Sequence, residues 1–288
     1  MTIKLRFGPA GFGAKLQEAA ANLERFHKLG IKACEIPFTY GVFIKEDKHK
    51  KEIREIKEAA EKFDIGLSIH APYWLNLNSK EKKKIKESKD RILACCKIGE
   101  LIGAYKVVFH PGYYGDMDKE ETYQNPRKSE EFSVAQKADR KEQAFCAIKK
   151  AVLEIREEIK KNKWSINIAA ETTGKINVFG SVEEIYRLVE DTGCSFCLDF
   201  SHLYARSLGK ISYGEIYKKF EQFPSLHCHF SGINFGDKGE KSHKLTPDSE
   251  IKKLLDALPK NKDITIINES PDPIGDALKM RHIVEKSR

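Results

Sequence analysis

Short apolar segments rich in β-branched residues alternate along the chain with longer stretches rich in Lys and Glu. The short segments have the composition of buried strands, and the longer stretches carry apolar residues at helical spacing. Eight repeats of this unit predict an α/β fold, a (β/α)8 TIM barrel, as a single domain over residues 1–288. An open doubly wound sheet is the alternative, but no G-x-G-x-x-G turn follows the first strand. The predicted strands are 3–7, 31–36, 65–69, 105–109, 165–170, 195–198, 225–228 and 264–268.

Histidines and carboxylates stand at the ends of six consecutive predicted strands, the third to the eighth. In a TIM barrel the loops after the strands form the carboxyl-terminal mouth, which holds the active site. These side chains are therefore expected to meet. They are His70, His110, Glu171, Asp199, His229 and Glu269, with His202 and His243 in later loop positions.

These residue types predict a metal site. Neutral imidazole and carboxylate are ligands that zinc, manganese and iron prefer. One histidine after a strand is often an ordinary hydrogen-bonded residue, but ligand-type residues after several independent strands favour a cluster. Asp199 and His202 lie three residues apart and could face one ion or two adjacent ions. Glu171 has two carboxylate oxygens and could bridge ions about 3.5–4 Å apart.

Two further polar positions leave alternatives open. His227 and His229 alternate by two, so their side chains should share one strand face. His229 lies nearer the mouth and is the expected ligand, whereas His227 is either an interior barrel residue or a partner of a ligand. Glu35, at the end of the second strand, is a catalytic group, an acceptor for a metal-bound histidine, or half of a structural ion pair.

Composition fits a soluble protein, expected in the cytoplasm, because no apolar run of about 18 residues and no charged-then-apolar leader occur. A net charge of +8 modestly favours phosphate-rich partners. The seven cysteines do not suggest a disulfide framework, and Cys194 and Cys197 are expected to fill a strand rather than to bind zinc. The long loop 111–130 either covers a ligand or is a surface excursion.

From about the third strand onward the chain resembles the endonuclease IV family of apurinic/apyrimidinic (AP) endonucleases, within the xylose isomerase-like barrel superfamily. The Asp-x-x-His piece and the His-x-x-Tyr-x-x-Asn-Leu piece are the most specific, and the order of all the pieces adds to them. The matching segments are HAPYWLNL at 70–77, FHPG at 109–112, ETTG at 171–174, CLDFSH at 197–202, HFSG at 229–232 and NESP at 268–271.

The resemblance implies a zinc-dependent enzyme of base excision repair that hydrolyses the phosphodiester 5′ to an abasic site in duplex DNA. It implies two or three zinc ions, with manganese as another possible metal. Glu171 and Glu269 would be the catalytic carboxylates. By the same resemblance His70, His110 and Glu171 would hold one ion, Glu171, Asp199, His229 and Glu269 a second, and His202 and His243 a third.

The sequence departs from the family at the third ion. An aspartate expected two residues before His243 is replaced by Lys241, whose ammonium has no lone pair to donate. The site must then use Glu240, recruit Asp237, accept water, or hold the ion weakly, and we favour Glu240. The first third of the chain also differs, since Phe7 begins a glycine-rich segment where the family has a histidine, and the basic loop after the second strand is absent.

Tyr73 matches a residue that in the family wedges into DNA beside the abasic nucleotide, and Trp74 extends the aromatic surface. The alternative for Trp74 is a core residue. Two other functions compete with DNA repair: a single-metal sugar or sugar-phosphate isomerase or epimerase, and a non-catalytic barrel that binds DNA or stores metal. A monomer is expected, because abasic DNA must reach an open mouth.

Overall fold

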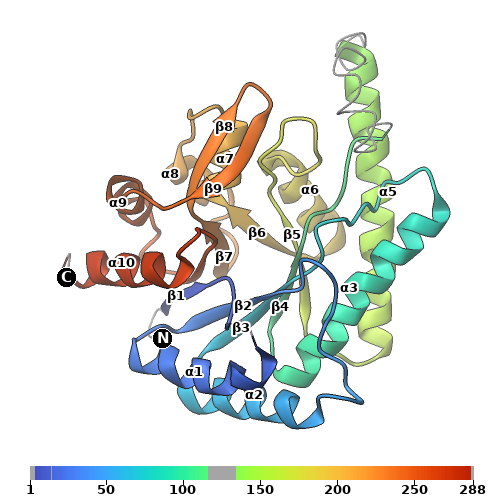
Figure 1. Ribbon diagram of the computed structural model, residues 1–288. Coiled ribbons are helices and arrows are strands. Elements are labelled where there is room, and N and C mark those ends of the chain that lie inside the picture. The colour runs from blue at the N-terminus through green and yellow to red at the C-terminus, as the bar shows by residue number, and fades with distance from the viewer. Residues whose placement is uncertain (1–3, 14, 116–133, 287–288) are drawn as a thin grey trace.

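The computed structural model describes residues 4–13, 15–115 and 134–286. Eight parallel strands form one sheet in the order β1-β10-β7-β6-β5-β4-β3-β2, and helices between them cover its outer face (Figure 1). The predicted (β/α)8 barrel is therefore confirmed. Its strands are β1 (Leu5–Pro9), β2 (Ala33–Pro37), β3 (Gly66–His70), β4 (Lys106–Phe109), β5 (Asn167–Glu171), β6 (Ser195–Asp199), β7 (Ser225–Phe230) and β10 (Asp263–Asn268).

The barrel closes where β1 meets β2. Ala10 and Glu35 form a parallel bridge there, and the backbone N–H of Gly11 donates to the Glu35 carbonyl at 2.7 Å. Gly8 makes this approach possible, because an added Cβ would lie only 1.8 Å from the carbonyl oxygen of Ala33. Closure joins the two edge strands, β1 and β2, so the carboxyl ends of all eight strands surround one mouth.

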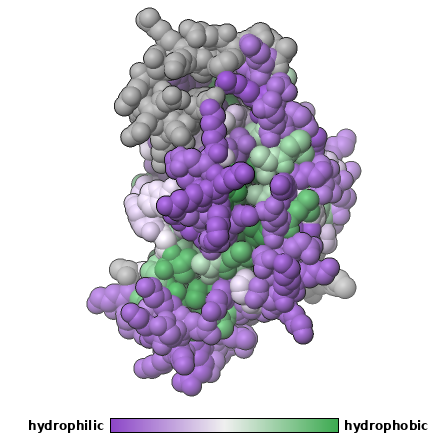
Figure 2. Space-filling model, turned by 90° about the vertical axis from the view of Figure 1, so that its right-hand side faces the viewer, coloured by the Kyte–Doolittle hydropathy of each residue, from purple (hydrophilic) through white to green (hydrophobic). Residues whose placement is uncertain are grey.

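Amphipathic helices pack against the outside of the barrel. In α2, for example, Ile53, Ile56 and Ala60 are buried, while Lys and Glu face solvent. Hydrophilic side chains likewise cover most of the face on the side of α3 and α5 (Figure 2). The helices are η1 (Leu16–Glu18), α1 (Ala19–Lys28), α2 (Lys50–Phe63), α3 (Lys82–Ile102), α5 (Val134–Lys161), α6 (Val182–Thr192), α7 (Phe200–Arg206), α8 (Tyr213–Lys219), α9 (Asp248–Asp256) and α10 (Pro273–Lys286).

Buried apolar side chains form a large outer cluster and a small, separate inner one. The outer cluster lies between the helices and the sheet, and the inner one contains Val108, Ala169 and Cys197. The interior of a TIM barrel is usually filled by branched apolar residues. Here buried polar side chains take part of that volume, namely Glu35, Ser68 and His227.

The observed strands differ from the predicted ones mainly at their ends. Several run one or two residues further than expected and include the polar residue at the mouth, because backbone pairing does not depend on side-chain polarity. A β-hairpin that the sequence did not predict, β8 (Gly232–Gly236) and β9 (Gly239–Lys244), follows β7. Most of loop 111–130 lies outside the described residues. Within the described part of the chain, none of the helices has the length and apolarity needed to cross a membrane.

We expect the substitution Gly8→Ala to destabilise the protein by about 1–3 kcal/mol or more, because the new methyl group would collide with the backbone of β2. Urea unfolding followed by circular dichroism measures the change. Gly214→Ala is the matched control, since an added Cβ at this exposed helical position meets nothing within 4 Å. Equal stability of the two variants would contradict the role of Gly8 in closure.

Candidate metal centre

The polar residues predicted at strand ends converge on the carboxyl-terminal mouth of the barrel. His70, Glu171 and Asp199 are the last residues of β3, β5 and β6. Each lies two positions after a buried residue of the barrel interior, and side chains two apart share a strand face. All three are almost completely buried. The other three are His229 near the end of β7, His110 directly after β4 and Glu269 directly after β10.

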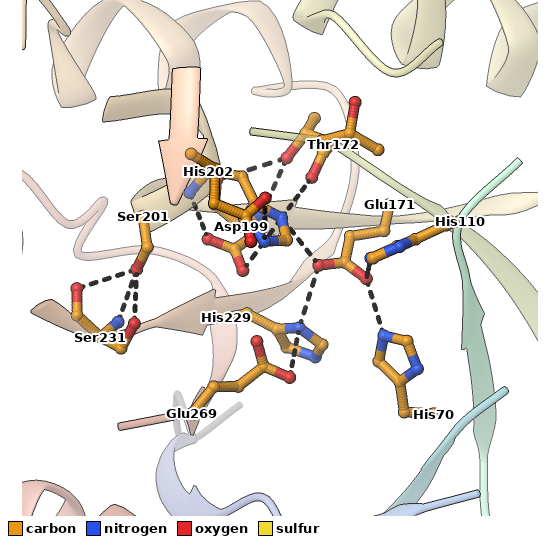
Figure 3. Close-up of polar contacts among 12 residues, drawn as sticks. His70, His110, Glu171, Thr172, Asp199, Ser201, His202, His229, Ser231 and Glu269 are labelled. Atoms are coloured by element: carbon orange, nitrogen blue, oxygen red, sulfur yellow. Dashed lines mark hydrogen bonds and ion pairs between the residues drawn. The ribbon is translucent and has the colours of Figure 1, made fainter. Parts of the chain in front are cut away.

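Glu171 lies at the centre of this arrangement (Figure 3). Its Oε2 is 3.0 Å from Nε2 of His70 and 3.0 Å from Nε2 of His110. Its Oε1 is 3.2 Å from Nδ1 of His202 and 3.3 Å from Nδ1 of His229. Each carboxylate oxygen therefore faces a different pair of imidazoles, and the four rings come from four separate segments.

Potential ligand atoms within 4.8 Å of one another form overlapping groups around this carboxylate. The first group contains His70, His110 and Glu171. The second shares Glu171 and adds three residues of neighbouring strands, and the third lies between α7 and the β8–β9 hairpin. Their members are Glu171, Asp199, His229 and Glu269 in the second group, and His202, Glu240 and His243 in the third.

Two of the histidines are oriented by backbone carbonyls. Nδ1 of His70 lies 2.7 Å from the oxygen of Ala71, and Nδ1 of His202 lies 2.9 Å from the oxygen of Thr172. When the ring is neutral its proton lies on Nδ1, which donates to the carbonyl, and Nε2 carries the lone pair that can bind a metal. In His70 that nitrogen faces Glu171, and in His202 it lies 3.5 Å from Oε2 of Glu240. This is how proteins fix the tautomer of a metal-binding histidine.

Side chains orient the rings of His243 and His229. Nδ1 of His243 lies 2.8 Å from the hydroxyl of Ser231, leaving Nε2 toward Glu240 at 4.0 Å. Nε2 of His229 lies 2.9 Å from Oε1 of Glu35, and its Nδ1 faces Glu171. Each of these two rings therefore turns one nitrogen to an acceptor outside the three groups and the other toward the carboxylates.

A β-bulge decides which residue of β9 faces the third group. Ile233 pairs with His243, but after a register shift Phe235 pairs with Glu240, so Lys241 is the extra residue. Because residues 233 and 235 share a strand face, Glu240 and His243 share one as well. Lys241 is exposed. The bulge therefore turns Glu240 toward His202 although it is three residues, not two, before His243.

Close packing against Gly174 holds the β8–β9 hairpin next to the strand ends. The N–H of Glu240 donates to the carbonyl of Gly174 at 3.1 Å, and a Cβ on Gly174 would lie 2.7 Å from Cβ of Glu240. The glycine in the segment after Glu171 thus permits the hairpin to approach the strand ends. Asp237, the other carboxylate considered for this position, is exposed in the hairpin turn and belongs to none of the candidate groups among the described residues.

Imidazoles compensate the negative charge of the buried carboxylates in this centre. Burial opposes the ionisation of Glu171, but the nearby His110 and His229 hold the pKa of its carboxyl well below the usual range. Burial lowers the pKa of His70, yet the hydrogen bond and charge of Glu171 outweigh it and raise that pKa to about 9. Burial raises the pKa of Asp199 more than His202 lowers it.

Several buried polar atoms of the centre lie close to one another but form no hydrogen bond of acceptable geometry. They include Oε1 of Glu171, Oδ2 of Asp199, Nε2 of His110 and Nδ1 of His229. Buried polar atoms in native proteins are normally bonded, so such a concentration requires an explanation. Divalent cations satisfy it, and the mixture of imidazole and carboxylate donors fits zinc, with manganese as the alternative.

The interior partner of His229 is a residue whose role the sequence left open. Glu35 is completely buried, and its position beside His229 agrees with an acceptor for a ligand histidine rather than with a group at the mouth. His227 lies inside the barrel and contacts Glu35 at 3.2 Å, as one of its two alternatives predicted. Sequence reasoning missed Ser231, although it stands in the same HFSG segment as His229.

Aromatic side chains line one side of the mouth. Tyr73 is 45% exposed, and its ring centroid lies 5.2 Å from that of His70 and 5.6 Å from that of His110. Trp74 is 47% exposed, so the alternative of a core residue is wrong. Its partner is Tyr40, which is 87% exposed and 5.7 Å away between centroids. No sequence pattern singled out Tyr40.

Fold and site together define a TIM barrel with a candidate metal centre at its carboxyl-terminal mouth. The chain belongs to the xylose isomerase-like TIM barrel family, which it matches over residues 23–283. It is 33% identical over 283 residues to Uncharacterized protein MJ0133 of Methanocaldococcus jannaschii, covering 93% of both chains. It is 23% identical over 230 residues to a protein of Mycobacterium marinum named Probable endonuclease 4, covering 79% of this chain and 80% of the relative.

Solved structures share the fold at low sequence identity. SacUVDE superposes with a TM-score of 0.70 at 14% identity, covering 99% of both chains. Endonuclease IV from Thermus thermophilus superposes with a TM-score of 0.66 at 19% identity, covering 98% of both. A D-tagatose 3-epimerase-like protein gives 0.63 at 20% identity, covering 98% of this chain and 96% of the other. The fold is thus common to proteins titled as nucleases and as epimerases.

We predict that protons and metal compete at His70. Its pKa in the folded metal-free protein lies above the ordinary value of 6.5, at about 9. The stabilisation from its pairing with Glu171 should therefore be complete below pH 6.5 and lost as the pH rises through about 9. Apparent zinc affinity should change in the opposite direction, rising at least about tenfold per pH unit from 7 to 9, since a proton must leave. Chelator competition measures the affinity, and thermal unfolding of chelator-treated protein measures the stability.

His27→Gln is the control, because His27 lies exposed on α1. It should leave both pH dependences unchanged. A zinc affinity that does not vary between pH 7 and 9 would show that the imidazoles of the mouth carry no proton that zinc must displace.

Proposed function

We propose that this chain is a zinc-dependent AP endonuclease that hydrolyses the phosphodiester 5′ to an abasic nucleotide in duplex DNA. The observation that carries the proposal is the position of Glu171, whose two oxygens face separate sets of imidazoles. A carboxylate placed in this way suits a bridge between two ions about 3.5–4 Å apart. The likeness to proteins named as endonuclease 4 and endonuclease IV supports a nuclease.

The candidate groups assign ligands to each ion. We propose that the first and second ions share Glu171 and that Glu240 completes a third site with His202 and His243. When bound, zinc would supply a water of lowered pKa and neutralise charge that grows on the phosphate. Glu269 stands beside His229 with its side chain 12% exposed, so it can accept a proton from the attacking water and hold that water in line.

DNA recognition is assigned to the aromatic side of the mouth. We propose that Tyr73, which reaches from solvent to His70 and His110, occupies the space beside an extruded abasic nucleotide, with Trp74 next to it. Extrusion costs least where no base is stacked, so such a wedge favours abasic sites. The net charge of +8 supports binding of the DNA backbone. The proposal takes the protein as a monomer.

A single-metal sugar epimerase is the second candidate. One observation favours it: Glu171, Asp199, His229 and Glu269 alone form a plausible site for one ion, and a structural neighbour is titled as an epimerase-like protein. That function gives no role to the other imidazoles, which lie in the first and third groups. We therefore prefer the nuclease, and incision of DNA distinguishes the two.

The test is incision of a duplex oligonucleotide that carries one tetrahydrofuran abasic analogue, which cannot undergo β-elimination. We expect a cut 5′ to the analogue that disappears after chelator treatment and returns with zinc. Glu171→Gln should lower the rate by at least about 100-fold and leave DNA affinity nearly unchanged, because only bridging and charge compensation are lost. Gel electrophoresis measures incision and fluorescence anisotropy measures binding.

Glu157→Gln makes the same chemical change at an exposed position of α5 and should cut like the wild type. Wild-type protein that leaves the analogue intact with zinc and with manganese would overturn the nuclease assignment. Undiminished cutting by Glu171→Gln would instead remove Glu171 from the catalytic residues.

The third ion provides a separate prediction. Glu240→Gln should weaken one zinc ion by about 10-fold or more while the other ions stay bound, because one carboxylate ligand is lost. Inductively coupled plasma mass spectrometry after dialysis measures the metal content. Lys241→Gln is the matched control on the outward side of the bulge and should retain all ions. Equal metal content of the two variants would contradict Glu240 as a ligand.

A further inference from the structure

One buried carboxylate lies below the candidate ligands rather than among them. Glu35 extends from β2 into the barrel with no exposed surface. Its Oε2 accepts hydrogen bonds from the hydroxyl of Ser68 at 2.7 Å and from Nε2 of His227 at 3.2 Å. Its Oε1 lies 2.9 Å from Nε2 of His229 in a closer but less well directed contact. Through these contacts Glu35 joins β2 to two other strands, β3 and β7.

The hydrogen bonds around Glu35 can be assigned donors and acceptors. The Glu35 carboxylate only accepts, so Nε2 of His227 donates to it, and Nδ1 of the neutral ring then accepts from the Tyr105 hydroxyl at 2.8 Å. With Ser68 donating as well, Oε2 has two donors. Oε1 is then left for the N–H of His229. This arrangement fixes the tautomer of His229 with its proton on Nε2 and its lone pair on Nδ1, the nitrogen that faces Glu171 and Glu269.

His229 differs in this respect from the other oriented ligands. The acceptors of His70 and His202 are backbone carbonyls, and that of His243 is a hydroxyl. A carboxylate acceptor holds the ring more strongly and makes the opposite nitrogen a better donor to a metal. The negative charge also lies close enough to compensate a cation at Nδ1. Of these four histidines, His229, the candidate ligand of the second ion, is therefore the one held most strongly.

We propose that Glu35 is a positioning residue that sets the affinity of the ion held by His229, Asp199 and Glu269. The proposal rests on the proposed function only in taking this group as a metal site, because the same support would serve a nuclease or an epimerase. Glu35 does not touch the substrate. It acts through His229, and Ser68 and His227 hold it in place.

The experiment compares zinc affinities of whole protein carrying Glu35→Gln with the wild type, using a chromophoric chelator as competitor. Glutamine keeps the size of the side chain but removes its charge. We expect one zinc ion to bind about 10–100-fold more weakly, with the remaining ions unchanged. The absorption spectrum of the cobalt-substituted protein should change for one site only. A merely structural effect would weaken all ions together.

Glu100→Gln is the matched control. Glu100 is partly buried on α3 and accepts hydrogen bonds from the N–H groups of Ser165 and Ile166, ahead of β5 and thus at the end of the barrel opposite the mouth. It should lower stability without altering any zinc affinity. If Glu35→Gln does not fold, Ser68→Ala replaces it, and a weakening of the same single ion by a few fold is expected from the loss of one donor to Glu35.

The outcomes separate the two proposals. Unchanged affinity of every ion in Glu35→Gln, or in Ser68→Ala if that variant is used, overturns the role of Glu35. A wild-type content of one ion per chain contradicts the multinuclear site. In that case the affinity of that one ion in Glu35→Gln still decides whether Glu35 positions its ligand.

Discussion

The buried carboxylate of Glu171 is the constraint on which the arrangement of the mouth depends. An ionised carboxylate without contact to water is unstable unless charges and donors surround it. Imidazoles from four separate segments provide that surrounding here, two at each oxygen. Because these segments are far apart in the sequence, the carboxylate can be compensated only when the barrel is closed. Fold and site are therefore stabilised by the same contacts.

The barrel interior forms part of the site rather than a neutral support. Side chains two apart on a strand point the same way, so each residue at the mouth stands above an interior residue. Under Glu171 and Asp199 that residue is apolar, whereas under His229 it is His227, hydrogen-bonded to Glu35. A polar interior has less apolar packing. Its hydrogen bonds, however, fix the His229 ring, whose orientation decides which nitrogen faces the carboxylates.

The β8–β9 hairpin shows how a local change of register can preserve a chemical group. A lysine stands where the endonuclease IV resemblance leads one to expect an aspartate. One extra residue in the strand turns that lysine to solvent and the preceding glutamate toward His202 and His243. A carboxylate thus remains in contact with both histidines, although the spacing in the sequence has changed. Linear motif matching is least reliable at such a bulge.

The sequence by itself determined the eight strand-and-helix units, the family, and the residues at the ends of the strands, because strand period and parallel topology bring all those ends to one rim. It left undecided the partner of Glu35, the nitrogen that each ring presents, the pairing of Tyr40 with Trp74, and the face on which Glu240 lies. The partner of Glu35 depends on contacts between distant positions, such as Glu35 and His227, which are 192 residues apart and meet only in the closed barrel. The other features depend on local hydrogen bonds, ring packing and the register of a hairpin. The folded chain alone defines these, so only the tertiary structure could decide them.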